Sequence, residues 1–312
     1  MMNTRWSPSL RAERRAAPKP ARLPSGDRPT YPSAEGRSSQ HGFTLLEAVI
    51  VIMLTGIVGV MVSTFIRQPI DAYVDLGRRA ELTDAADLAL RRMARELRTA
   101  LPNSVRVDAS GTFVEFLPVR STGRYRAALS ATGSGDILDF SSSSDSSFDI
   151  LGPTVAAVSG DQLVVHNLGL PGADAYEGTS RRALGSTGTA LSSLSYTVGG
   201  TQFPYASPSS RFHIVSRPVT FACTPLAGGA GSLRRYGGYA IQSSQPSSTG
   251  AAPLSSLSGN NNALLSNWVA ACSFTYAASA TTRNAVVTLR LTLTSGGESI
   301  TLLQQVQVEG SP

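Results

Sequence analysis

The sequence predicts an α+β protein in which one long N-terminal helix, membrane-spanning in its first half, precedes an antiparallel, β-rich globular head. Three observations predict this fold. An apolar run over residues 43–66 is long enough to span a membrane, and an amphipathic helical pattern continues over residues 67–101. Short strand-like segments punctuated by Gly, Ser and Asp then fill residues 102–312, which are numerous enough to bury a core.

Composition and charge narrow the class of protein. Charged residues make up 15% of the chain, below the roughly 25% that is usual for soluble domains. The net charge is +6, but residues 1–42 carry eight basic and three acidic residues, which leaves +1 (6 − 5) for the rest of the chain. Because the positive charge lies before the apolar run and outside the predicted head, it does not indicate nucleic-acid binding.

The apolar run over residues 43–66 predicts a single membrane crossing. A helix of this length measures about 36 Å, enough for a hydrocarbon core of about 30 Å. It is longer than a secretory signal core, and no small-residue cleavage site follows it at Arg67. The basic flank keeps residues 1–42 in the cytoplasm, so the chain after Arg67 is exported.

Glu47 is the only charged residue within this run. A carboxylate in a membrane helix is unfavourable, less so near an interface than at the centre. By position alone two interpretations are equally good: an edge charge that reaches the headgroups, or a charge that waits for a partner met only on assembly.

The segment HGFTLLE, residues 41–47, resembles the class III signal of type IV prepilins and type II secretion pseudopilins. The resemblance implies that a prepilin peptidase cuts between Gly42 and Phe43, removes residues 1–42 as a leader, and N-methylates Phe43. It also implies that Glu47, the fifth residue of the mature chain, pairs with the terminal amine of a neighbouring subunit. His41 stands where the family usually has Lys or Arg. The leader is long, so either it is a genuine long leader or the start codon lies downstream.

Residues 67–101 predict an amphipathic continuation of the helix. Pro69 should kink it or mark a local break, because proline lacks an N–H and clashes with the preceding turn. The helix should stop before Pro102-Asn103. An arginine cluster over residues 91–98 fits a solvated face with local pairs such as Asp87–Arg91 better than a partner-binding patch. The predicted apolar stripe consists of Leu82, Ala86, Leu90, Met93, Leu97 and Leu101.

The head is predicted to consist of short strands. Runs such as TFVEFLPV, RYRAAL, DILDF and QLVVHNL have strand length, and segments 141–147, 169–189, 204–210 and 243–261 have loop composition. The clearest prediction is a C-terminal hairpin with one buried face. Alternating apolar residues from Val287 to Leu293 are followed by a turn at Ser295–Glu298. The alternation resumes from Ile300 to Val308 and is broken by Gln304.

The two cysteines are Cys223 and Cys272, each in a strand-like run. In the cytosol they would be buried free thiols, whereas export favours a disulfide between them. The predicted export therefore leads us to expect the bond.

A second, finer resemblance extends over residues 42–312. The segment after the apolar run, GRYR at 123–126, LRRYGGYAI after the Cys223 strand, and the terminal SGGESITLLQQVQVEG resemble MshO-type minor pilins of the mannose-sensitive haemagglutinin (MSHA) pilus. The resemblance implies a structural subunit whose partners are other pilins, the prepilin peptidase and an inner-membrane assembly platform. The RELR stretch at 95–98 is also similar to the J-type minor pseudopilins of type II secretion, the alternative assignment.

No catalytic or metal-binding motif stands out, so we expect neither enzymatic activity nor a cofactor. His166 and His213 lie in strand-like runs typical of structural positions, and SSSSDSSFD at 141–149 lacks a calcium-loop spacing. Two alternatives to a structural pilin are an adhesin and a signal-anchored periplasmic enzyme or sensor. Aromatic residues near loops that would serve an adhesin are Tyr205, Tyr236 and Tyr239, although core or β-edge roles fit them better.

Overall fold

The computed structural model describes residues 42–277 and 284–310. The chain divides into two units, Met1–Met61 and Val62–Pro312, and the division falls inside helix α1 (Leu45–Leu97). Every sheet belongs to the second unit. Apart from Gly42, the predicted leader lies outside the described residues.

Helix α1 runs for 53 residues and passes through Pro69 without interruption. The local break that we allowed for at this proline is therefore absent. A proline inside a helix removes one intrahelical hydrogen bond, and the neighbouring turns can hold the helix across that gap. A kink at Pro69 remains a prediction.

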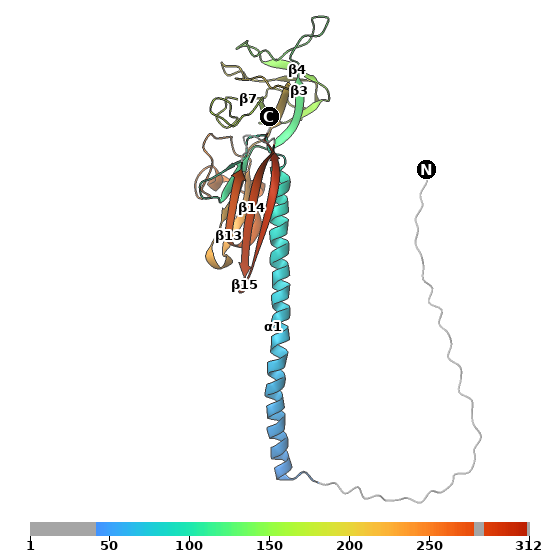
Figure 1. Cartoon of the computed structure of the whole chain (residues 1–312), viewed down its shortest axis with the longest axis vertical. Helices are drawn as coiled ribbons and strands as arrows, with labels where there is room; N and C mark the ends of the chain where they lie inside the picture. Colours follow the sequence, from blue (N-terminus) through green and yellow to red (C-terminus); the bar gives the residue numbers. More distant parts are fainter. Residues whose placement is uncertain (1–41, 278–283, 311–312) are drawn as a thin grey trace, which may run out of the picture. The chain divides into compact units, whose positions relative to one another are not determined.

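The C-terminal part of α1 buries the predicted apolar stripe against the first sheet. Leu82, Ala86 and Leu90 are 2% exposed or less, and Met93 and Leu97 are fully buried. These side chains share one core with residues of the sheet strands, and the ribbons of β13, β14 and β15 lie alongside this part of the helix (Figure 1). The 3.6-residue periodicity of the sequence thus predicted the buried face correctly.

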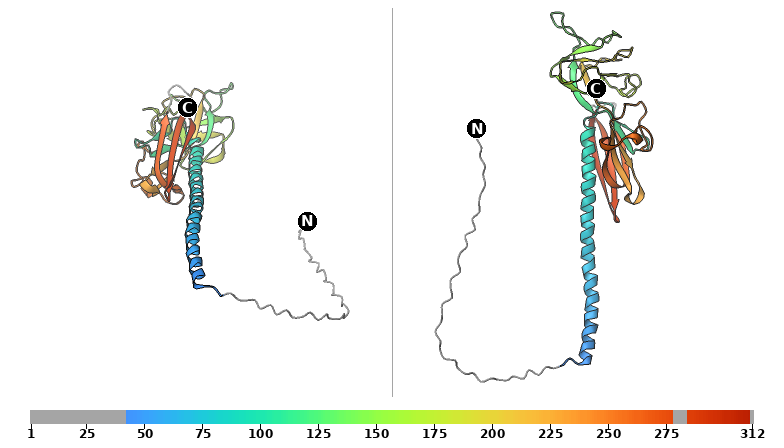
Figure 2. Two further views of the ribbon diagram at one scale, coloured as in Figure 1. Left: turned by 60° about the horizontal axis from the view of Figure 1, so that its bottom comes forward. Right: turned by 180° about the vertical axis from the view of Figure 1, so that it is seen from behind.

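The first sheet is antiparallel and forms the larger layer of the head. Among the described residues it has seven strands, in the order β1-β2-β11-β12-β13-β14-β15. Figure 2 shows the sheet from two further sides, with the helix on one face of it. The strands are β1 (Arg106–Val107), β2 (Phe113–Phe116), β11 (Val219–Thr224), β12 (Gly231–Gly237), β13 (Asn262–Ala277), β14 (Asn284–Ser295) and β15 (Glu298–Glu309).

The hairpin β14–β15 confirms the prediction for the C-terminal segment. Leu293 pairs with Ile300 and Leu291 with Leu302, while Gln304 faces Leu289. Gly296 and Gly297 form the turn with φ of 56° and 88°, which is the backbone of a two-residue turn that requires positive φ at both positions. The turn is fastened to α1, where Arg78 donates to the carbonyl of Gly296 at 3.1 Å and Arg79 pairs with Glu298 at 2.5 Å.

A disulfide joins Cys223 of β11 to Cys272 of β13, two strands that are not neighbours in the sheet. The contact arises because β13 extends past the start of β12, where Phe274 donates its backbone N–H to Gly111 at 2.7 Å. Cys223 donates to the adjacent Thr112 carbonyl at 2.9 Å, so both cysteines meet at the same corner of the sheet. Their Cα atoms are 6.6 Å apart.

The second layer of the head is a smaller antiparallel sheet with its own aromatic core. Phe148 and Phe212 pack edge to face there, with ring centroids 5.3 Å apart. The sheet order is β7-β6-β10-β3-β4-β9, and β5 pairs with β8 beside it. These strands are β3 (Val119–Tyr125), β4 (Ser147–Leu151), β5 (Val155–Ala157), β6 (Gln162–Val164), β7 (Arg181–Ala183), β8 (Gly188–Leu191), β9 (Ser193–Ser195) and β10 (Arg211–Val215). The described part of the head also contains the 3-10 turns η1 (Ala227–Gly229), η2 (Leu254–Ser256) and η3 (Gly259–Asn261).

The structure corrects four local predictions. The helix ends at Leu97 rather than Leu101, because Ala100 bridges to Pro118 and Leu101 donates to the Leu117 carbonyl. DILDF is not a strand, and the strand predicted over RYRAAL ends at Tyr125. The expected loop 169–189 contains β7 and the start of β8.

Candidate functional site

The predicted processing site, Gly42–Phe43, lies at the start of the described residues. Gly42, Phe43 and Thr44 are non-helical, and α1 starts at Leu45. The side chain of Phe43 is 80% exposed, and no atom lies within 4 Å of where a Cβ of Gly42 would be. The Gly42–Phe43 peptide bond is therefore exposed and non-helical, and it lies directly before a helix.

Thr44 caps this helix, which the sequence interpretation missed. Its hydroxyl oxygen accepts the backbone N–H of Glu47 at 3.2 Å, and its carbonyl accepts the N–H of Ala48 at 3.1 Å. The signal was present as T-x-x-E over residues 44–47, a capping box in which the threonine satisfies a free N–H of the first turn. The cap fixes where the helix begins relative to Gly42.

Glu47 lies in the first turn of α1 with an exposed side chain. Within residues 42–277 and 284–310 its carboxylate has no hydrogen-bond or ion-pair partner. A carboxylate in the first turn is favoured by the helix dipole. The geometry thus leaves Glu47 available to a group from outside the described chain.

The apolar part of α1 is long and hydrophobic enough to cross a membrane, by its length and composition. Its most apolar 18-residue window has a mean hydropathy of 2.6 and no buried residue. The exposed side chains include Ile52, Met53, Val60 and Phe65, which are 67–78% exposed. Such a surface needs an apolar environment, either lipid or other apolar helices.

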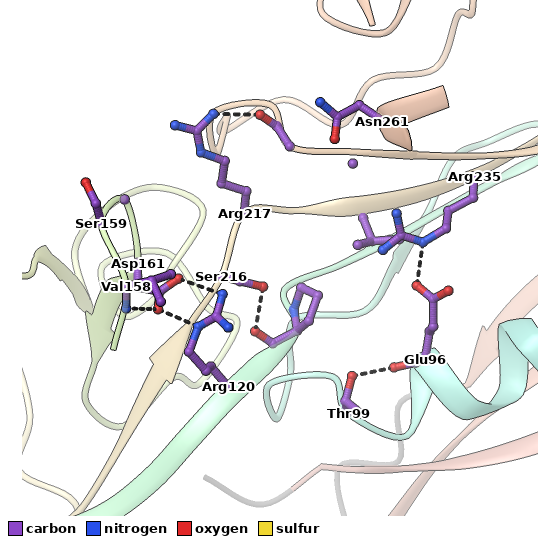
Figure 3. Close-up of a pocket in the computed structure, with 15 residues that line it drawn as sticks. Glu96, Thr99, Arg120, Val158, Ser159, Asp161, Ser216, Arg217, Arg235 and Asn261 are labelled. Carbon is purple, nitrogen blue, oxygen red and sulfur yellow. Dashed lines mark hydrogen bonds and ion pairs between the residues drawn. The ribbon is translucent and has the colours of Figure 1, made fainter. Parts of the chain in front are cut away.

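The head brings together charged residues in a groove between its two sheets, here called the inter-sheet groove (Figure 3). Its volume is about 350 Å³. Arg120 pairs with the buried Asp161 at 2.6 Å, and Arg235 pairs with Glu96 at 2.6 Å. Arg217 donates to the carbonyl of Gly238 at 2.7 Å. Two of its three guanidinium groups are thus neutralised by carboxylates within the groove.

A second charged cluster joins the paired strands β1 and β2. Glu115 is fully buried, pairs with Arg106 at 2.6 Å and accepts the hydroxyl of Tyr239 at 2.7 Å. Burial raises the pKa of Glu115, and the charge of Arg106 acts in the opposite direction. Tyr239 and Tyr236 belong to a core cluster, whereas Tyr205 is 55% exposed. Two of the three aromatics considered for an adhesin are therefore core residues.

Among the described residues, no group of three or more His, Cys, Asp and Glu side chains has a metal-binding arrangement. His213 lies on β10, whereas His166 follows the end of β6 with a φ of 51° and is not in a strand as expected. The Nδ1 atom of each is buried without a hydrogen-bond partner among the described residues. In the segment 141–149, Asp145 accepts the backbone N–H of Asp139 at 2.7 Å. The carboxylates of this segment thus bond to neighbouring groups of their own loop, as Asp139 also accepts the hydroxyl of Ser141 at 2.6 Å.

Comparison with known families identifies one match, the prokaryotic N-terminal methylation motif, over residues 37–63. No curated protein matches the chain. No solved structure matches it either.

The motif, the long apolar helix that follows it, and the antiparallel β-rich head support a type IV pilin-like or pseudopilin precursor. The class III signal implies processing by a prepilin peptidase and assembly with other pilins in a membrane system. The motif and the apolar helix fit a protein anchored in the inner membrane.

Proposed function

We propose that this chain is a minor pilin of a type IV pilus, of the MSHA type, which serves as a structural and assembly subunit in pilus biogenesis with surface attachment as a further role. The leader, residues 1–42, is removed by prepilin peptidase, and Phe43 becomes the N-methylated terminus. The head lies in the periplasm before assembly and on the fibre afterwards.

The observation that carries this proposal is the geometry of the Gly42–Phe43 bond within the methylation motif. The bond is non-helical and exposed, and the helix cap at Thr44 keeps it outside α1. Proteases bind extended backbone, and a glycine lets the enzyme approach closely. Helical backbone at this position would have to unwind before cleavage.

Assembly is proposed to use Glu47. After cleavage the new amine of Phe43 and the carboxylate of Glu47 are separated along the same chain by little more than one helical turn. In apolar surroundings each charge is costly unless it is paired. Pairing the Phe43 amine of one subunit with the Glu47 carboxylate of the next neutralises both charges. Within its own chain the backbone N–H of Glu47 is not available to the carboxylate, because it already donates to the Thr44 hydroxyl.

The apolar helix surface supplies the second contact. Its residues are exposed in the single chain over the whole most apolar window. In the membrane this surface faces lipid, and in the fibre it packs against the same surface of other subunits. The amphipathic part from Leu82 onward stays with the head, whose core it completes.

The test is mass spectrometry of the N-terminus, on protein purified from membranes of strains with and without prepilin peptidase. We expect a mature chain that begins at N-methyl-Phe43 in the first strain and an uncleaved chain in the second. Gly42→Val should block cleavage, whereas Gly36→Val, a matched change within the leader, should not. An intact terminus in both strains would contradict the proposal and leave a signal-anchored periplasmic domain.

The type of fibre is tested by isolation of the assembled polymer. Recovery of this chain in sheared MSHA-type pili supports the minor-pilin assignment. Recovery only with a type II secretion pseudopilus would assign it to the J-type pseudopilins, to which the RELR stretch at 95–98 is similar.

A further inference from the structure

Two arginines face each other on the second layer of the head. Arg124 of β3 and Arg211 of β10 are direct partners in an antiparallel register. Like charges at such positions repel and destabilise a sheet. In the part of the chain that the structure describes, neither guanidinium forms an ion pair with a carboxylate, and Arg124 donates only to the carbonyl of Ser209, at 3.2 Å.

His213 extends this basic cluster. It follows Arg211 by two residues on β10, so both side chains lie on one face of the strand, and it pairs with Thr122 of β3. Its Nδ1 atom is buried and has no hydrogen-bond partner. Burial and the nearby charge of Arg211 lower the pKa of His213 to about 4, so the imidazole is neutral near pH 7.

These residues line a cavity of about 360 Å³. That volume is at the lower end of the range for small-molecule sites. The lining consists of Thr122, Gly123, Arg124, Arg211, His213 and Glu309, the last from the end of β15. The two guanidiniums and the one carboxylate leave a net positive charge in the cavity.

The inter-sheet groove provides an internal comparison. There Arg120 and Arg235 each have a carboxylate at 2.6 Å, so their charges are satisfied within the protein. Arg124 and Arg211 lack such a partner and also face one another. An anion between them would remove the repulsion and form charge-assisted hydrogen bonds with both guanidiniums.

We propose that this cavity binds an oxyanion of the sulfate or phosphate type, held between Arg124 and Arg211 and hydrogen-bonded by His213. The group is either a free ion or is carried by a small sugar. Glu309 lines the same cavity and supplies a carboxylate that accepts hydrogen bonds from hydroxyl groups of such a ligand. The two guanidinium donors and the single carboxylate acceptor of the lining suit a hydroxylated molecule with one anionic group.

The test uses the full-length protein in nonionic detergent micelles. Sodium sulfate is titrated against sodium chloride at matched ionic strength, because sulfate keeps its charge over the pH range in which His213 titrates. The readouts are the imidazole resonance of His213 and the thermal midpoint. We expect saturable binding, a rise in the pKa of His213 and a sulfate-specific rise in the midpoint, with the His166 resonance as an unchanged reference.

Three variants separate binding from folding. Arg211→Gln and Arg124→Gln should each weaken sulfate binding roughly tenfold or more, and without sulfate should leave the midpoint equal or higher, because one like charge is gone. Arg290→Gln, on the exposed face of β14, is the matched control and should bind as the wild type. A response to sulfate equal to that of chloride, or an unchanged response in both Arg124 and Arg211 variants, would overturn the proposal.

A second arm distinguishes the source of the oxyanion. Galactose 6-sulfate that binds more tightly than inorganic sulfate assigns the site to a sugar-borne group, and equal affinity assigns it to the free ion. Binding of unsulfated galactose as tight as that of its sulfate would contradict an oxyanion site.

Discussion

Arg235 of β12 and Glu96 in the last turn of α1 form an ion pair with an Nε–Oε2 distance of 2.6 Å, although 139 residues separate them in the chain. Both side chains are largely buried, with 22% and 25% exposed. Glu96 also pairs with Arg92 at 3.3 Å within the helix. The pair therefore joins the end of the helix to the middle of the first sheet.

We expect Glu96→Gln and Arg235→Gln to lower the stability of the head non-additively, with a coupling of about 1 kcal/mol, because shielding from solvent strengthens the pair. A double-mutant cycle by chemical denaturation in micelles measures the coupling. The Asp87–Arg91 pair, whose side chains are 43% and 70% exposed, should show a smaller coupling. Equal couplings for the two pairs would show that burial does not matter here.

Glu47→Ala should leave processing intact and impair incorporation into fibres, because the cleaved bond precedes the helix while the carboxylate serves the assembled state. Peptide mass spectrometry and quantification of the chain in sheared fibres give the two readouts. Glu81→Ala, a change of the same kind on the later part of the helix, is the control. Normal incorporation of Glu47→Ala would contradict the proposed pairing of the Glu47 carboxylate with the Phe43 amine of a neighbouring subunit.

Loss of the Cys223–Cys272 bond should destabilise the head. The bond closes a loop with a sequence separation of 49, for which the chain-entropy model gives about 4 kcal/mol. Cys223→Ala with Cys272→Ala should lower the free energy of unfolding by up to this amount and leave the sheet register unchanged. Hydrogen exchange of the β13 amides measures the free energy of opening, and the pattern of protected amides shows whether the pairing of the strand is retained. Unchanged exchange at Phe274 would show that the corner holds without the bond.

Acidification should destabilise the head through His213, which faces Arg211, Arg124 and Glu309 in its cavity. Its folded-state pKa of about 4 is below the ordinary value of 6.5. Between these values the unfolded chain binds the proton and the folded chain does not, so stability falls as pH decreases from 6.5 to about 4. The loss is at most about 3 kcal/mol.

The variant His213→Gln removes this titration, so its stability should change less over the same pH window. Chemical denaturation at a series of pH values, without sulfate, makes the comparison. An identical pH dependence in wild type and variant would assign the acid sensitivity to groups other than His213.

The sequence was informative where local periodicity determined the structure. The stripe from Leu82 to Leu97 and the alternation of β14 and β15 are predicted from spacing alone, because one face of each element is buried. DILDF failed because its Leu138 N–H bonds the Arg126 carbonyl in a loop rather than a neighbouring strand. A short apolar run does not specify its partner.

The candidate sites also differ in how far they can be predicted from the sequence. Gly42, Phe43 and Glu47 lie within a contiguous motif and were found by reading along the chain, and Thr44 was detectable from the same letters. The facing of Arg124 and Arg211 depends on strand pairing between residues 87 positions apart (211 − 124), for which the sequence contains no local signal. From the sequence both arginines are expected in the head, but nothing in it indicates that they are paired across neighbouring strands.

The link between β11 and β13 also changes how damage to the head would be seen. A protease that cuts anywhere between residues 224 and 271, which includes the long segment 243–261, leaves both fragments tethered through Cys223 and Cys272. Such nicked molecules migrate as one full-length species on a non-reducing gel and separate into two bands only after a reductant is added. A cleaved head therefore sheds no fragment while this bond is intact.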